Sequence, residues 1–145
     1  MHKNTRFRLA ALVICAAAVL AAVVLARGSR GIMSLPYGVR TTEGRQAYLH
    51  ALGWEIDPAT EDVRETSVPE TFDAMMQDYN ALQREQGFDL TPYRGMPVTV
   101  VTYEVTNCPD TENVCVTLWI CDNVVIAGDV HSTAMDGFMY GIVKE

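Results

Sequence analysis

The chain has 145 residues, 49% of them hydrophobic, and a formal net charge of −7 at pH 7. The charge is unevenly distributed, because residues 1–30 carry a net of +5 and residues 31–145 a net of −12. The strongly acidic charge of residues 31–145 argues against nucleic acid as a partner, because nucleic-acid-binding proteins neutralise phosphates with Lys and Arg. Residues 40–145 are enough for one hydrophobic core and too few for two.

The N-terminal region contains an uncharged segment of eighteen residues, 9–26, without proline or glycine. As a helix it spans about 27 Å, close to the hydrocarbon thickness of a bilayer. Lys3, Arg6 and Arg8 precede it and favour a cytoplasmic N-terminus. A cleaved signal peptide is the alternative, although the segment exceeds the usual apolar core of about 7–15 residues.

These features predict a single-pass protein of a bacterial cell membrane. We expect a basic cytoplasmic segment over 1–8, a transmembrane signal anchor in contact with membrane lipid over 9–26 and a linker over 27–39. The acidic domain, 40–145, would then be extracytoplasmic.

The first predicted helix begins after Thr41 or Thr42, either of which is suited to cap it, and ends at Gly53. A half-buried strand over 54–57 follows, and the turn at Asp57-Pro58 leads to a second extended segment over 63–68.

The second predicted helix starts at Pro69, where the missing N–H costs nothing, and ends at Gly87. Apolar residues three and four positions apart predict one buried stripe. The stripe consists of Phe72, Met75, Met76, Tyr79 and Leu82.

From residue 98 the hydrophobic pattern changes to period 2 and predicts strands over 98–106, 114–121 and 124–131. Asp122-Asn123 predicts a two-residue hairpin turn. That turn would pair Cys121 with Val124, Trp119 with Ile126 and Val116 with Asp129. Both faces of this hairpin would be apolar, so the segment 135–142 or a partner must cover one of them.

Three cysteines lie in the acidic domain, and an odd number leaves at least one unpaired. Cys108 and Cys115 flank a predicted hairpin loop, which makes a disulfide between them plausible, with buried free thiols as the alternative. A zinc site formed by these two, Cys121 and His131 would lack a close pair of cysteines. We therefore expect no metal and no cofactor.

The segment 128–133 is the densest polar cluster, and Asp129 and His131 share a strand face because they are two residues apart. An Asp beside a His can prepare an imidazole for base catalysis. No nucleophile motif accompanies them, and Ser132 points to the opposite face. The alternative is that Asp129 caps the following turn and His131 lies at a strand end.

The sequence also resembles a family of small exported bacterial domains, the domain-of-unknown-function family numbered 4830. The resemblance covers about residues 40–142, and the segment 86–90 is its most distinctive part. It rests on the following residues: Arg45, Leu49, Gly53, Trp54, Phe72, Tyr79, Asn80, Gln83, 86–90, Tyr93, Gly95, 103–107, 128–130 and 136–139. It implies a membrane segment followed by one compact domain, and it implies no reaction and no catalytic residues.

The expected fold class is α+β, with two helices packed on one side of a mainly antiparallel sheet of four or five strands. The expected function is a membrane-anchored binding or regulatory module of the cell envelope, with an envelope protein or peptide as partner. Two alternatives stay open: a small hydrolase that uses Asp129 and His131, and an envelope spacer without a specific ligand.

Overall fold

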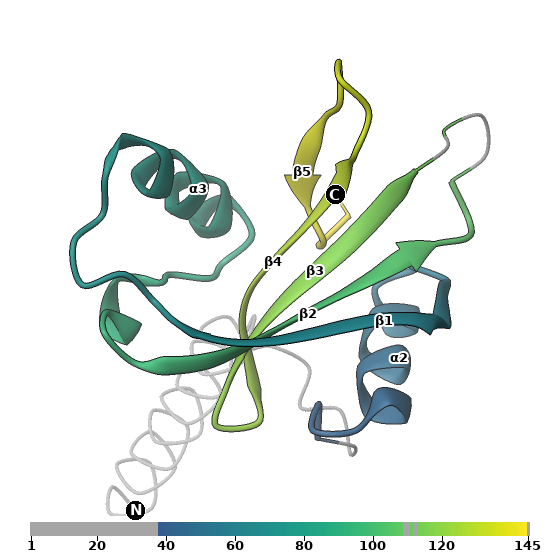
Figure 1. Ribbon diagram of the computed structural model, residues 1–145, viewed down its shortest axis with the longest axis horizontal. Coiled ribbons are helices and arrows are strands. Elements are labelled where there is room, and N and C mark those ends of the chain that lie inside the picture. The colour runs from purple at the N-terminus through teal and green to yellow at the C-terminus, as the bar shows by residue number, and fades with distance from the viewer. Residues whose placement is uncertain (1–37, 109–110, 112, 145) are drawn as a thin grey trace, which may run out of the picture. The chain divides into compact units, whose positions relative to one another are not determined.

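The computed structural model describes residues 38–108, 111 and 113–144. They form a five-stranded antiparallel sheet in which the strands follow one another in chain order, together with two α-helices and a short 3-10 helix (Figure 1). The elements are α2 Thr42–Ala51, β1 Ile56–Ser67, α3 Ala74–Glu85, η1 Thr91–Tyr93, β2 Pro97–Val105, β3 Val114–Cys121, β4 Val124–Ser132 and β5 Met139–Gly141. The predicted α+β class, with two helices on an antiparallel sheet, is confirmed.

The predicted membrane segment, 9–26, and the residues around it lie outside the described part of the chain. Among the helices that are described, none combines the length and the hydrophobicity that crossing a bilayer requires.

The two helices pack on opposite faces of the sheet. Tyr103 of β2 hydrogen-bonds to Arg45 of α2, whereas Trp119 of β3 packs against the ring of Tyr79 of α3. Tyr103 pairs across the strands with Val116, three residues before Trp119, and side chains alternate between the faces of a sheet. The prediction that both helices cover one side was therefore wrong, and each apolar face has its own helix.

Helix α2 begins and ends where the sequence predicts. The Thr41 hydroxyl accepts a hydrogen bond from the Gly44 N–H, and the helix ends before Gly53, whose φ of +86° suits a glycine.

Helix α3 starts at Ala74, later than the predicted first residue Pro69, and Asp73 caps its first turn. The Asp73 carboxylate accepts a hydrogen bond from the Met76 N–H at 2.8 Å. The chain is still extended at Val68, because the backbone of this residue hydrogen-bonds to Gly95 and Met96. Met75, expected in the buried stripe, is 80% exposed.

The two extended segments predicted on either side of Pro58 belong to one strand, β1. Asp57 pairs with Glu104 and Asp62 with Thr102, so residues 58–61 bulge out opposite the single residue Tyr103. The Thr60 hydroxyl fills the gap, because it accepts the Glu104 N–H and donates to the Asp57 carbonyl. The bulge places Glu61 on the α2 side of the sheet, in contact with Tyr103.

The turn at Asp122-Asn123 is confirmed, since both residues have positive φ and Cys121 pairs with Val124. Farther from the turn the predicted pairs were wrong. An irregularity in β4 shifts the register, so Trp119 pairs with Ala127 and Val116 with Val130. As a result Asp129 lies opposite Thr117, on the face that α3 covers in part.

Candidate functional site

The candidate site is centred on Asp129, which is 3% exposed. One carboxylate oxygen accepts the Tyr79 hydroxyl at 2.7 Å, and the other lies 2.7 Å from Nδ1 of His131. The structure thus brings together the two residues singled out by sequence and adds Tyr79 from α3. With Nδ1 directed at a carboxylate, Nε2 of a neutral His131 is left as an acceptor or ligand atom.

Tyr79 keeps its proton in this arrangement. Burial, reinforced by the neighbouring Asp129 carboxylate, raises the pKa of Tyr79 far above its usual value. Tyr79 is therefore a fixed hydrogen-bond donor to Asp129.

Strand register places three further side chains in line with His131. Glu104 pairs with Cys115, Cys115 with His131, and His131 with Met139, so these four lie in one row across β2 to β5, which we call the polar row. Directly paired residues of antiparallel strands share a face. Burial and the Glu104 charge raise the pKa of the Cys115 thiol, so this cysteine is not activated as a nucleophile in the structure.

The described cysteines, Cys108, Cys115 and Cys121, are free thiols. Burial and, after it, the neighbouring Cys108 raise the pKa of Tyr140, so Cys108 lies near that ring. Tyr140 packs against Trp54 after α2, whereas Cys115 belongs to the row on the other face. Cys108 and Cys115 are therefore directed to different faces of the sheet. A disulfide between them remains a prediction for oxidising conditions.

The nucleophile considered next to His131, Ser132, is engaged elsewhere. Its hydroxyl accepts the N–H of Ala134 at 3.2 Å, in the turn after β4.

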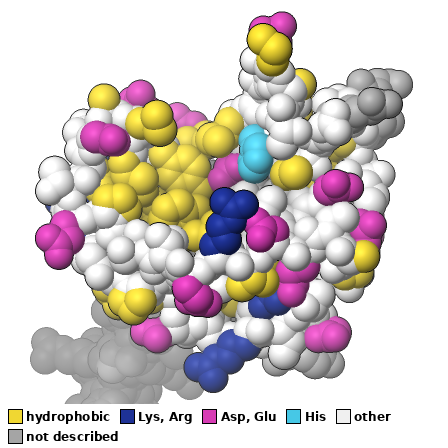
Figure 2. All heavy atoms as spheres, viewed as in Figure 1, with side chains coloured by type: hydrophobic (Ala, Val, Ile, Leu, Met, Phe, Trp, Pro, Cys, Tyr) yellow, Lys and Arg dark blue, Asp and Glu magenta, His cyan; other side chains and the backbone are white. Residues whose placement is uncertain are grey.

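An apolar surface adjoins the polar row. It consists of Met76 and Tyr79 of α3, Val100 of β2 and Trp119 of β3, all only partly buried, and we call it the α3-side surface. The rings of Tyr79 and Trp119 lie 5.8 Å apart. Figure 2 shows hydrophobic side chains gathered between α3 and the strands, with acidic, basic and histidine side chains beside them.

Two glutamines, Gln83 of α3 and Gln86 at its C-cap, fix the helix on β4. The Gln83 side-chain oxygen accepts the Gly128 N–H, and the Gln86 amide donates to the Gly128 carbonyl, both at 2.9 Å. A Cβ at Gly128 would lie 2.6 Å from Ile142 Cδ1, so glycine at this position lets the Ile142 side chain pack closely against β4. Sequence reasoning missed this junction, although the spacing of Tyr79, Gln83 and Gln86 places all three on one helix face.

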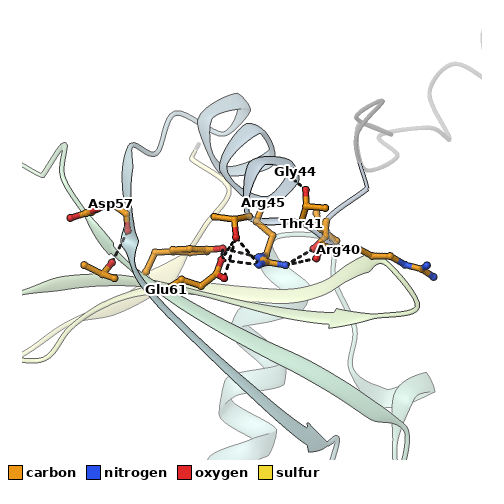
Figure 3. Close-up of polar contacts among 10 residues, drawn as sticks. Arg40, Thr41, Gly44, Arg45, Asp57 and Glu61 are labelled. Atoms are coloured by element: carbon orange, nitrogen blue, oxygen red, sulfur yellow. Dashed lines mark hydrogen bonds and ion pairs between the residues drawn. The ribbon is translucent and has the colours of Figure 1, made fainter.

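A second polar cluster lies on the α2 side of the sheet, around the buried Arg45 (Figure 3). Its guanidinium donates to Glu61 at 2.7 Å, to the Tyr103 hydroxyl at 2.7 Å and to the carbonyls of Val39 and Arg40. The cluster joins the start of the domain to α2 and to the β1 bulge, which is a structural role.

Acidification is expected to destabilise the domain through Glu61. Burial opposes its charge, but hydrogen bonds from Arg45, Tyr103 and Thr42 prevail and lower its pKa. A lowered pKa in the folded state gives stability above the unfolded value of about 4.3, which is lost as the pH falls through the folded-state pKa. The free energy of unfolding should therefore decline below about pH 5.

Glu61→Gln provides the check, by urea denaturation at a series of pH values. The free energy of unfolding of the variant should decline less steeply as the pH falls. The decline that remains comes from other groups such as Asp89, whose pKa is lowered by hydrogen bonds with Thr91 and Asn80. Identical slopes for the two proteins would contradict the assignment.

Within the ranges that the structure describes, no three His, Cys, Asp or Glu side chains are grouped so as to hold a metal ion. Of these residue types, only Cys115 is paired directly with His131 in the row, because Glu104 lies one strand farther away and Met139 carries a thioether.

Comparison with known protein families identifies the family to which the chain is similar. The model of the family described as Domain of unknown function (DUF4830) matches residues 48–130. This range includes Tyr79, Glu104, Cys115 and Asp129, whereas His131 and Met139 lie beyond its end. No curated protein matches the chain, and no solved structure does.

Proposed function

The chain belongs to the domain-of-unknown-function family DUF4830, and from this premise we propose that it is a membrane-anchored binding module of the bacterial cell envelope. Residues 9–26 would be the anchor and the acidic domain would lie outside the cytoplasm. The uncharged segment and the change from +5 to −12 along the chain support this arrangement.

The observation that carries the binding role is the α3-side surface. Trp119 and Val100 extend from the sheet beside Tyr79 and Met76, and none of the four is fully buried. No element of the described ranges 38–108 and 113–144 covers them completely. Tyr and Trp side chains that are only partly buried, with an apolar body and a polar group, are enriched at binding surfaces.

The charge around this surface favours a cationic ligand. Glu104 is exposed in the polar row, and the domain as a whole carries a large negative charge. Arg64 pairs with Asp62 at 2.6 Å, which cancels its charge locally. We propose an envelope protein or peptide segment with basic and apolar residues, whose association should weaken as salt screens the charges.

Photocrosslinking tests this function in membranes that contain the full-length protein. Benzoylphenylalanine at position 119 keeps an aromatic group on the α3-side surface, and the same residue at Tyr140, on the α2 side, is the matched control. We expect a discrete adduct from position 119 that diminishes in high salt. Equal adducts from both positions, or none from position 119, would favour the spacer reading.

A hydrolase is the second candidate, favoured by the Asp129–His131 hydrogen bond. In that case His131→Ala should leave the fold intact, because the side chain is partly exposed, and should abolish hydrolysis of the substrate. Circular dichroism and a screen of ester and peptide substrates would measure the two effects. Unchanged hydrolysis, or an unchanged phenotype in cells, would eliminate this candidate.

A further inference from the structure

The polar row across β3, β4 and β5 has an unusual composition. Its three consecutive members are a thiol, an imidazole and a thioether, from Cys115, His131 and Met139. The Ser132 N–H bonds to the Phe138 carbonyl, so the adjacent pair His131–Met139 is of the non-hydrogen-bonded kind, with Cα atoms about 4.5 Å apart. All three side chains therefore project side by side from one face.

The imidazole of His131 is oriented for a ligand. Asp129 binds Nδ1, and the Tyr79 hydroxyl holds Asp129 from the other side. Histidines that bind metals usually donate their other ring nitrogen to a carboxylate, which fixes the ring and raises its basicity. Nε2 is the atom left for coordination.

The donor set favours a soft cation. Thiolate and thioether sulfur select Cu(I), whereas zinc prefers four ligands drawn from Cys, His and carboxylates. The row offers two sulfur atoms and one nitrogen, with the exposed carboxylate of Glu104 beside Cys115 to attract a cation. Cys115 and His131 are partly exposed and Met139 is exposed, so an ion can reach them.

We propose that Cys115, His131 and Met139 form a binding site for Cu(I). The Cys115 thiol loses its proton to solvent as the sulfur–copper bond forms, so that one proton is released for each ion bound and the copper keeps its oxidation state. The site does not require the α3-side surface to bind anything, and so it stands apart from the proposed function.

Competition for Cu(I) against a chromophoric chelator such as bicinchoninate tests the site. The protein is the full-length chain in detergent, without oxygen, in a background in which Cys15, Cys108 and Cys121 are replaced by Ser, Ser and Ala. We expect one Cu(I) per chain. Cys115→Ser and His131→Gln should each weaken binding by more than the roughly 10–100-fold typical of a lost outer-shell partner, and Asp129→Asn by about that factor.

Matched variants distinguish the site from adventitious binding. Met139→Leu should weaken binding, whereas Met135→Leu on the same hairpin and His50→Gln on α2 should leave it unchanged. Circular dichroism shows whether each variant is folded. The proposal is overturned if folded Cys115→Ser binds Cu(I) as tightly as its parent, if the control variants weaken binding equally, or if Zn(II) displaces Cu(I) at equal concentration.

Discussion

Arg45→Ala is expected to lower the free energy of unfolding by about 3 kcal/mol, near the lower end of the range for breaking a buried ion pair. The variant removes the charged donor of the Glu61 carboxylate, which keeps only the hydroxyls of Tyr103 and Thr42, and it removes the donor of the Tyr103 hydroxyl. It also removes the hydrogen bonds to the carbonyls of Val39 and Arg40. The lower end of that range applies because the Glu61 side chain is 22% exposed and keeps some access to water.

Urea denaturation followed by tryptophan fluorescence measures this loss, and Arg64→Ala is the control. Arg64 pairs with Asp62 on the exposed face of β1, and such pairs contribute about 0–1 kcal/mol. If both variants lose the same amount, the Arg45 cluster does not hold the start of the domain to the sheet.

Trp54→Ala is expected to have the largest effect on stability, a loss of about 3–5 kcal/mol. Trp54 is buried, its ring N–H donates to the Ile142 carbonyl at 2.6 Å, and the Lys144 ammonium lies 3.8 Å from the ring centroid. The residue thus joins the end of α2 to the C-terminal segment, and truncation leaves both a cavity and an unpaired carbonyl.

Denaturation of this variant is followed by Trp119, the second of the two tryptophans in the chain. Trp54→Phe separates the contribution of the ring volume from that of the hydrogen bond. It keeps most of the volume and loses only the hydrogen bond, which is worth about 1 kcal/mol. Tyr140→Ala, at a partly exposed ring packed against Trp54, should cost less than Trp54→Ala. A loss below about 1 kcal/mol for Trp54→Ala would show that the C-terminal segment contributes little to the core.

Local signals predicted the parts of the fold that depend on neighbours in sequence. Thr41 and Gly53 delimit α2 as expected, and Asp122-Asn123 forms the β3–β4 turn. The start of α3 was misplaced because long-range bonds to Gly95 and Met96 keep Val68 extended. The β3–β4 register was misplaced because an irregularity next to Ile120 has no local signature.

The same distinction holds for the candidate site. Asp129 and His131 were found because they are two residues apart on a strand. Cys115 and Met139 were not connected with them, because their proximity depends on the pairing of three strands. Tyr79 was expected only as a core residue, and the tertiary position of α3 is what directs its hydroxyl to Asp129.

Protease accessibility tests the proposed membrane arrangement most directly. In right-side-out spheroplasts that express the full-length chain, added protease should digest the acidic domain and leave a short membrane-bound fragment that contains residues 9–26. A cytoplasmic marker protein should remain intact. Full protection of the domain until the membrane is lysed, together with recovery of the intact chain in the soluble fraction, would contradict the account.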